Sequence, residues 1–563
     1  MVMQPASDPS GVQATFCATL VDQWVRMGLR HAVIAPGSRS TPMALAFAAR
    51  DDLDVQVVHD ERAASFIALG VGLSTGVPAA LLCTSGTAAT HFHGAVVEAD
   101  LSSVPMLVLT ADRPPELHGI GAPQTIDQID LYGAVVRCFA DPGPPEAADA
   151  EVWREWAEDW WMSAVDGDPG PVHVNLPFRE PLVGVAGDLP PVAAGVPEAE
   201  PDTWFMMRPD MVELAAMLSA QRGLIVAGRG IDDIDAVNTL ATRLGWPILA
   251  DARSGCRHLP AAICAFDALL RVPTFAAAHR PSVVLHLGEP PASKVLGQWL
   301  AAGDATHVQV HAQQRILDPL QIMHERVYGH VSSVCSELLN AMTVAPDDEW
   351  SGAWQRADKA AQQAFDESLR AMGGLNEPAV ARWLSMFNGN VVTSSSMPVR
   401  DLEWFGMPGA TTRVFSNRGA NGIDGVISSG IGVALATGER TVVHIGDVAF
   451  LHDQTALTAL AGRGLPLTIV VTDNDGGAIF SFLPQATQLP ADRFEQLFGT
   501  PHGTDVLMLA TAHGLGARDV ESIAQLRDAV YDDAVTVVRV RTTRANNVDV
   551  HARLNAAVAA ALA

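Results

Sequence analysis

The segment LPLTIVVTDNDGG (465–477) decides the fold class, because a short apolar run ends in it abruptly at oxygen-bearing side chains. Residues 467–472 are apolar or β-branched, which is typical of a strand buried on both faces. Two carboxylates, one amide and two glycines follow at once. An EF-hand calcium loop is disfavoured, because Pro484 occupies the twelfth position counted from Asp473, where a Glu is needed. A plain turn stays open as an alternative, since Asn, Asp and Gly dominate turns.

Short apolar runs alternate with amphipathic stretches along most of the chain. In the first 180 residues we expect helices at 12–29, from about 42, at 61–76 and 87–99, and strands at 31–36, 55–59, 78–84 and 104–112. Further strands are expected at 223–228, 281–288 and 307–311, and then at 441–446, 467–473 and 535–541. Short continuous apolar strands between helices are typical of parallel sheets covered on both faces. The sequence therefore predicts an α/β fold with three doubly wound parallel-sheet domains.

The chain of 563 residues is too long for one hydrophobic core. Two stretches rich in proline and acidic residues, at about 186–205 and 344–351, interrupt the helix and strand patterns and are interpreted as linkers. They divide the chain into predicted domains at 1–185, 206–343 and 352–563.

Charge and cysteine content exclude several classes of function. The formal net charge of −27 argues against a nucleic-acid partner or an anionic membrane surface, so any anionic ligand must be held by locally clustered arginines. The six cysteines form no CxxC pair, which suits reduced thiols better than a disulfide framework or a zinc site. The N-terminus lacks a charged-then-apolar leader, and no apolar run reaches about 18 residues. We expect a cytoplasmic protein.

Polar residues at two strand ends indicate a site for a metal ion and a diphosphate. Strand 441–446 ends in Gly446 and Asp447, and Asn474 lies 27 positions after Asp447, the length of one helix plus one strand. In a βαβ unit the two carboxyl ends lie side by side. The carboxylate, the amide oxygen and the carbonyl of Gly476 form a hard-oxygen set that leaves room for phosphate oxygens around Mg²⁺. The glycines allow close approach, and the following helix directs its N-terminus at the anion.

The segment GDVAFLHDQTALTAL…LPLTIVVTDNDGG resembles the metal motif of thiamin-diphosphate-dependent enzymes. The resemblance implies that Asp447, Asn474 and the carbonyl of Gly476 hold Mg²⁺ or Mn²⁺, which anchors the coenzyme. It also implies that the coenzyme diphosphate lies against 446–449, that is, Gly446, Asp447, Val448 and Ala449. Ala449 departs from the many relatives with a hydroxyl residue there, so backbone N–H groups must bind the phosphate.

Two further residues are implied to serve the coenzyme. The segment VVHDERAASF (57–66) places Glu61 at a strand end, where family members supply the catalytic carboxylate that promotes coenzyme activation. Favourable charge at a helix N-terminus is the alternative role of Glu61. The segment NRGANGIDG (417–425) resembles the one with the apolar residue that props the coenzyme in its bent form, which nominates Ile423. An ordinary core position is the alternative for Ile423.

Within that family, the first domain is most similar to the MenD enzymes of menaquinone biosynthesis, through APGSRSTP (35–42), TSGTAA (84–89), ADRPPEL (111–117) and GAPQTIDQ (121–128). The resemblance continues in DGGAIFSFLP (475–484) and covers nearly the whole chain. It implies a transferase that decarboxylates 2-oxoglutarate and adds the resulting succinyl carbanion to isochorismate in a 1,4 sense. The product would be 2-succinyl-5-enolpyruvyl-6-hydroxy-3-cyclohexene-1-carboxylate.

Both implied substrates are multiply anionic, so their site needs several cationic side chains. The basic candidates within or beside the matching motifs are Arg39, Arg113, Lys294, Arg400 and Arg418. Each alone has a surface charge as its alternative. Family likeness adds the hydrogen-bonding residues Ser38, Gln124 and Ser396, and an apolar wall of Ile479, Phe480 and Leu483. Val295 stands where relatives often carry a second basic residue.

Two other functions stay open from the sequence. One is a different thiamin-dependent 2-oxoacid decarboxylase or carboligase, which the set of arginines disfavours. The other is a catalytically silent thiamin-fold binding protein, which Glu61 and the complete metal set disfavour. Because Glu61 and the metal motif lie in different predicted domains, we expect a homodimer or homotetramer with active sites at subunit interfaces.

Overall fold

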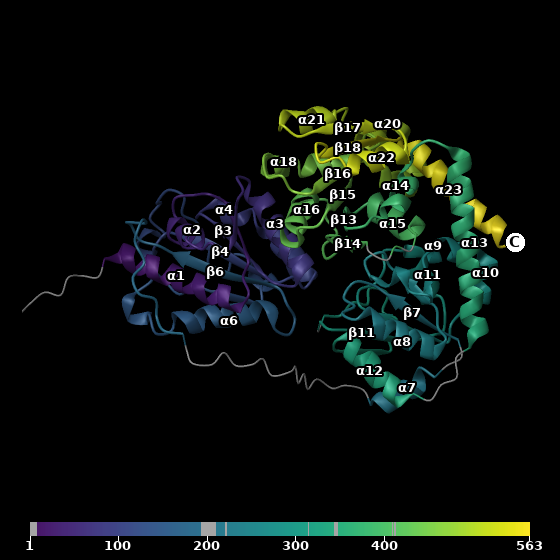
Figure 1. Cartoon of the computed structure of the whole chain (residues 1–563), viewed down its shortest axis with the longest axis horizontal. Coiled ribbons are helices and arrows are strands. Elements are labelled where there is room, and N and C mark those ends of the chain that lie inside the picture. Colours follow the sequence, from purple (N-terminus) through teal and green to yellow (C-terminus); the bar gives the residue numbers. More distant parts are fainter. Residues whose placement is uncertain are drawn as a thin grey trace, which may run out of the picture. The chain divides into compact units, whose positions relative to one another are not determined.

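The computed structural model describes residues 8–192, 210–219, 222–313, 315–342, 347–407, 409 and 412–563. The described residues form three six-stranded sheets of parallel strands, which confirms the predicted fold class (Figure 1). The chain divides into two compact units. Unit 1 comprises the described residues of Met1–Glu200 together with Asn417–Glu439 and His452–Leu467. Unit 2 comprises those of Pro201–Ser416, Arg440–Leu451 and Thr468–Ala563.

Unit 1 contains the first sheet, with strand order β2-β1-β3-β4-β6-β5. The strands are β1 (His31–Ile34), β2 (Asp54–Val57), β3 (Ala79–Cys83), β4 (Met106–Asp112), β5 (Cys138–Ala140) and β6 (Pro171–Pro177). The helices are α1 (Pro9–Met27), α2 (Thr41–Ala48), α3 (Glu61–Thr75), α4 (Thr87–Thr90), α5 (His93–Leu101), α6 (Trp153–Val165), α16 (Val426–Thr437) and α18 (Ala456–Leu460). The four predicted strands are confirmed. The helix predicted over 87–99 is instead two helices, because short-range bonds such as Phe92 N–H to the Ala89 carbonyl (3.3 Å) tighten the chain between them.

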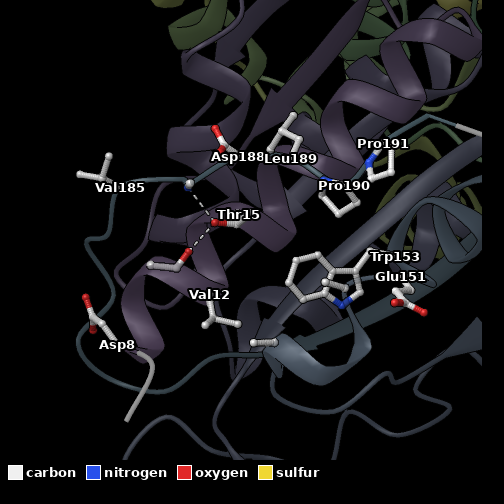
Figure 2. A pocket seen from close by; sticks show the side chains of 14 residues that line it. Asp8, Val12, Thr15, Glu151, Trp153, Val185, Asp188, Leu189, Pro190 and Pro191 are labelled. Atoms are coloured by element: carbon white, nitrogen blue, oxygen red, sulfur yellow. Dashed lines mark hydrogen bonds between the residues drawn. The ribbon is translucent and has the colours of Figure 1, made fainter. Parts of the chain in front are cut away.

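Aromatic packing joins the helices on one face of this sheet. Phe16 of α1 meets Trp153 of α6 edge to face, with ring centroids 5.2 Å apart. Trp24 is fully buried, and its indole N–H donates to the Ala157 carbonyl at 2.9 Å. A cavity of about 750 Å³ opens beside α1, with Thr15 and the segment 185–191 in its wall (Figure 2). None of the predicted site residues lines this cavity, so the site must be sought elsewhere.

Helices α3 and α16 approach each other at backbone distance. A methyl group on Gly70 would lie 2.1 Å from the Ser429 carbonyl oxygen, and one on Gly432 would lie 2.1 Å from the Ile67 carbonyl oxygen. Any larger residue at either glycine would force the helices apart. The contact therefore fixes α16, which is distant in sequence, against the helix that begins with Glu61.

Unit 2 contains two sheets, with strand orders β12-β11-β10-β7-β8-β9 and β14-β13-β15-β16-β18-β17. The first has strands β7 (Gly223–Ala227), β8 (Ile248–Ala250), β9 (Ala262–Ile263), β10 (Val283–Leu287), β11 (Thr306–His311) and β12 (Glu325–Tyr328). Helices α7 (Met211–Met217), α8 (Ile234–Leu244), α9 (Phe266–Leu270), α10 (Pro273–Ala278), α11 (Lys294–Ala301) and α12 (Val331–Ala341) accompany it. The three predicted strands of this sheet are confirmed.

The other sheet of unit 2 has strands β13 (Asn390–Thr393), β14 (Arg413–Phe415), β15 (Thr441–Gly446), β16 (Leu467–Asp473), β17 (Ala517–Val520) and β18 (Val537–Arg541). Its strands at 441–446, 467–473 and 535–541 were all predicted and are confirmed. The accompanying helices are α13 (Asp348–Met372), α14 (Glu377–Leu384), α15 (Met397–Phe405), α17 (Asp447–His452), α19 (Gln485–Gln488), α20 (Ala491–Phe494), α21 (Val506–Ala512), α22 (Ile523–Val530) and α23 (Arg544–Ala561).

The predicted linkers fall partly outside the described residues. Of the first, 193–205 lie outside them, and 186–192 carry no helix or strand. Of the second, 344–346 lie outside them, whereas 348–351 form the first turn of α13. The domain boundaries of the sequence analysis stay a prediction. Within the described part of the chain, every helix is too short or too polar to cross a lipid bilayer.

Candidate active site

The ends of β15 and β16 bring the predicted metal ligands together. These strands are neighbours in their sheet, so Asp447 and Asn474 emerge side by side. Asp447 is 1% exposed, and its Oδ2 accepts the backbone N–H groups of Asn474 and Gly476, both at 3.0 Å. Its Oδ1 accepts the Val448 N–H at 2.7 Å. The carboxylate thereby orders both strand ends at one point.

The side chain of Asn474 presents a buried oxygen that no described residue pairs. Its Nδ2 donates to Oε1 of Glu377 at 3.0 Å. Its Oδ1 is buried and has no hydrogen-bond partner among the described residues. A buried amide oxygen is costly to leave unpaired, and a hard cation satisfies it. Together with the Asp447 carboxylate, this oxygen fits the divalent metal that the sequence predicts.

Two glycines leave space beside Asp447 and Asn474 at the ends of β15 and β16. A methyl group at Gly476 would lie 1.9 Å from the Gly499 carbonyl oxygen, and the φ of Gly476 is +136°, so another residue is disfavoured there. A methyl group at Gly446 would meet nothing within 4 Å, which leaves space at the end of β15. Val448 and Ala449 follow in the first turn of α17, and Ala449 is buried.

Two residues not predicted from the sequence lie beside the predicted metal ligand Asp447. Asp447, Asp473 and His502 each offer a ligand atom, and these three atoms lie within 4.8 Å of one another. His502 Nε2 lies 3.4 Å from Asp447 Oδ2. The loop that carries His502 is tied to Asp475, whose Oδ1 accepts the N–H groups of His502 (2.9 Å) and Gly503 (2.8 Å). Burial and, second, the charge of Asp447 raise the pKa of Asp473.

The predicted polar substrate residues of unit 2 gather around α15. Ser396 precedes this helix with φ +73°, and its carbonyl accepts a hydrogen bond from Nη1 of Arg400. Burial lowers the pKa of Arg400, whereas the charges of Glu403 and Asp401 oppose that shift. The backbone N–H of Ala292, two residues before the exposed Lys294, donates to Glu403 Oε2 at 2.8 Å. The segment that carries Lys294 is thus attached to the helix that carries Arg400.

The predicted apolar wall follows directly after the metal ligands. Ile479 and Phe480 lie in a short 3₁₀ helix, Ala478–Phe482, and are half-buried. Phe480 packs against Phe498, with ring centroids 5.4 Å apart. Leu483 is 38% exposed. All three therefore offer apolar surface close in the chain to Asn474 and Gly476.

Unit 1 gathers two of the predicted arginines and Gln124 around the loop after β3. Arg113 Nη1 donates to Ser85 Oγ, and Gln124 Nε2 donates to the Ser85 carbonyl at 3.0 Å. The backbone N–H of Arg39 donates to Thr84 Oγ1 at 3.3 Å. Burial and, second, the charge of Arg39 lower the pKa of Arg113. Two guanidinium groups near each other can bind one carboxylate together.

The remaining groups of Arg39 set its orientation. Its Nη1 donates to the Phe178 carbonyl at 2.9 Å, and its Nη2 lies 3.3 Å from Glu180 Oε1. Its Nε is buried without a hydrogen-bond partner within the described ranges. Ser38, the residue before it, is exposed, and its carbonyl accepts the Thr41 N–H at 3.2 Å.

Glu61 is the first residue of α3, but another residue caps that helix. Oδ1 of Asp60 accepts the Ala63 N–H at 3.0 Å. The neighbourhood of Glu61 includes Cys83 at the end of β3, whose pKa is raised by burial and, second, by the Glu61 charge. The cap of α3 is therefore Asp60, while Glu61 lies in the first turn, where its charge also favours the helix N-terminus.

Arg418 and Ile423 lie in the loop before α16, and the buried Glu98 of α5 holds this loop. The Glu98 carboxylate accepts the N–H groups of Gly419 and Ala420, both at 2.7 Å. Arg418 and Ile423 are half-buried, and the loop ends at Gly425 beneath the Phe66 ring of α3, where a methyl group would lie 1.9 Å from the ring. The structure thus places Ile423 and Glu61 on adjoining elements of unit 1.

Sequence reasoning missed several residues of the site. Ser85 and Asp473 lie inside quoted motifs, so their position at a strand end was an available signal. Glu98, Glu377 and His502 gave no such signal, because each reaches the site only through a contact with a distant segment.

Three family models match successive parts of the chain. Residues 15–131 match the family model "Thiamine pyrophosphate enzyme, N-terminal TPP binding domain", and residues 403–540 match "Thiamine pyrophosphate enzyme, C-terminal TPP binding domain". Between them, residues 204–390 match "Middle domain of thiamine pyrophosphate". The chain therefore has the three domains of a thiamin-diphosphate enzyme.

Curated relatives are similar over nearly the whole chain, and those described next are named 2-succinyl-5-enolpyruvyl-6-hydroxy-3-cyclohexene-1-carboxylate synthase. The protein of Thermobifida fusca (strain YX) is 42% identical, over 96% of this chain and 98% of its own. The protein of Myxococcus xanthus (strain DK1622) is 39% identical, over 99% of both chains. That of Chloroflexus aurantiacus is 38% identical, over 97% of this chain and 96% of its own. The chain belongs to this family of thiamin-diphosphate-dependent synthases.

Proposed function

We propose that this protein is a transferase that decarboxylates 2-oxoglutarate and adds the remaining succinyl unit to isochorismate, a step of menaquinone biosynthesis. The observation that carries the proposal is the pair of groups at the ends of β15 and β16: the Asp447 carboxylate and the buried Oδ1 of Asn474, which has no hydrogen-bond partner in the described part of the chain. Full-length similarity to synthases of this name supports the choice of substrates.

The chain's own residues would hold the cofactors at the strand ends. Asp447, Asn474 and the carbonyl of Gly476 bind Mg²⁺ or Mn²⁺, and Asp473 and His502 lie close enough to contribute. The backbone of 446–449 would hold the coenzyme diphosphate, Ile423 would support the coenzyme, and Glu61 would exchange a proton with its aminopyrimidine ring. When bound, thiamin diphosphate supplies the nucleophilic carbon and the electron sink for the loss of carbon dioxide.

Positive groups would orient the two anionic substrates. Arg39 and Arg113 in unit 1 offer planar forks suited to carboxylates, and Arg418 adds a third guanidinium group. In unit 2, Arg400 would offer a further guanidinium group and Lys294 an ammonium group to the substrate carboxylates. The smaller groups are Ser38, Gln124 and Ser396 for hydrogen bonds, and Ile479, Phe480 and Leu483 for the apolar face of the substrates.

The active protein is proposed to be a homodimer or homotetramer in which a second copy completes each site, because Glu61 and Asp447 belong to different compact units. Mixing two inactive variants tests this. In a mixed dimer of Glu61→Gln and Asp447→Asn chains, a shared site carries both substitutions or neither, so part of the activity returns. Sites contained within one chain would give no recovery. The six free cysteines agree with a cytoplasmic location.

The reaction itself is tested by incubating the protein with Mg²⁺, thiamin diphosphate, 2-oxoglutarate and isochorismate, and identifying the product by mass. Omitting isochorismate separates the proposed carboligation from simple decarboxylation. Rapid conversion of 2-oxoglutarate to an aldehyde with no adduct would favour a decarboxylase instead. Bound coenzyme without turnover of either substrate would favour a silent binding protein.

A further inference from the structure

Glu377 is a buried carboxyl group that does not cap the helix it begins. It is the first residue of α14 and is 2% exposed. The cap of this helix is Asn376, whose side chain accepts the Ala379 N–H at 3.0 Å. Burying a carboxyl group is unfavourable unless its oxygens are satisfied by hydrogen bonds. Its partners therefore indicate its purpose.

One oxygen of Glu377 receives two hydrogen bonds from distant segments. Oε1 accepts from Nδ2 of Asn474 at 3.0 Å and from Oγ1 of Thr542 at 2.8 Å. Both donors approach the same oxygen, so Oε1 is the acceptor that this carboxyl group offers to the Asn474 amide.

An acceptor at that point determines which way the amide of Asn474 faces. The amide has a donor end and an acceptor end, and anchoring its Nδ2 on Glu377 turns Oδ1 to the opposite side. That oxygen is the buried atom without a hydrogen-bond partner among the described residues, beside the Asp447 carboxylate. With the amide reversed, an NH₂ group would face the cation and repel it.

We propose that Glu377 is a positioning residue that holds the amide oxygen of Asn474 toward the metal. The inference rests on the proposed function, because it assigns a metal to Asp447 and Asn474. Outer-shell partners of this kind typically change metal affinity 10- to 100-fold when they are lost. The competing role for Glu377 is a favourable charge in the first turn of α14, which would affect stability and not metal binding.

The test compares substitutions that keep or remove the acceptor. Glu377→Gln keeps an oxygen that can replace Oε1, whereas Glu377→Leu removes every acceptor. Thr542→Val is the matched control, because it deletes the other donor to Oε1 and leaves the Asn474 bond. Affinity for Mn²⁺ in the presence of thiamin diphosphate is measured by electron paramagnetic resonance of the free ion. Melting of the ligand-free proteins is recorded beside it.

We expect the Leu variant to bind Mn²⁺ 10- to 100-fold more weakly, and the Gln and Thr542→Val variants to stay within about threefold of the wild type. If the Leu variant does not fold, Glu377→Ala, which has no side-chain acceptor and leaves room for water, takes its place. Wild-type affinity in a folded variant without the acceptor would overturn the proposal. So would a tenfold loss in Glu377→Gln with unchanged melting. Absence of Mn²⁺ binding by the wild type would instead refute the proposed function.

Discussion

Replacing Asp447 by Asn tests the proposed metal site with the smallest change in shape. In the ligand-free protein the new side chain can keep one oxygen for the N–H groups of Asn474 and Gly476, but its NH₂ then opposes the Val448 N–H. The variant loses one hydrogen bond, and two others are no longer strengthened by a charge. We expect its free energy of unfolding to fall by about 1–3 kcal/mol. The fold should survive, because the core of the sheet is untouched.

The larger effect should be on stabilisation by ligand. At a coenzyme and metal concentration about 100 times the wild-type Kd, binding adds about 2.7 kcal/mol to stability, and a 100-fold weaker Kd reduces this to about 0.4 kcal/mol. Calorimetric melting with and without Mg²⁺ and thiamin diphosphate measures both values. Asp492→Asn is the control, because it removes the same charge from an exposed position of unit 2 outside the proposed ligand set. A full ligand-induced shift in Asp447→Asn would refute the metal assignment.

Three further predictions address the catalytic carboxylate, the arginines and acid stability. Glu61→Gln should melt nearly as the wild type and keep coenzyme binding, while exchange of the coenzyme thiazolium C2 proton slows by orders of magnitude; wild-type exchange would make Glu61 only a helix-terminal charge. Arg113→Lys should lower kcat/KM about 10- to 100-fold despite the retained charge, because the planar fork that contacts Ser85 is lost; unchanged kinetics for both substrates would contradict this. Burial lowers the pKa of His444 to about 3, so the unfolded state, in which the imidazole titrates near pH 6.5, binds the proton first, and stability should fall as the pH drops below about 6.5. Urea unfolding measures how far the free energy of unfolding falls between pH 7 and pH 5. We expect this decrease to be about 2 kcal/mol smaller in His444→Gln than in the wild type, and an equal decrease would contradict the assignment.

The parallel-sheet fold was predictable because its strands are short, apolar and buried on both faces. The strand 467–473 was predicted with the bounds that the structure gives. Strands such as β9 (Ala262–Ile263) were not predicted, because two or three residues at a sheet edge leave no recognisable pattern. The helix expected over 87–99 is interrupted at His91 and Phe92, where local hydrogen bonding prevails over an apolar pattern that is otherwise continuous.

Part of the candidate site was predictable for a different reason. Asp447 and Asn474 meet because consecutive parallel strands end at the same edge of a sheet, and that rule can be applied to a sequence. Glu377 meets Asn474 across 97 positions, and Glu98 meets Gly419 across 321, without any shared strand register. Such partners depend on how helices pack over the sheets. Sequence spacing carries no information about that packing.

The interleaving of the two compact units limits how this chain can be divided or recombined. Residues 417–439 and 452–467 lie within the C-terminal family domain but belong to unit 1. Glu98 and Gly70 contact the first of these segments. The second is bonded through Arg62, which donates to the His452 carbonyl, and through Arg463, which donates to the Val57 carbonyl.

A hybrid enzyme joined near residue 200 would therefore combine α3 and α5 from one parent with α16 from the other. If either parent has a residue larger than glycine at Gly70 or Gly432, its side chain would clash with the backbone of the facing helix. Exchange of the N-terminal domain between relatives should give a folded protein only if residues 417–439 are taken from the same parent as that domain.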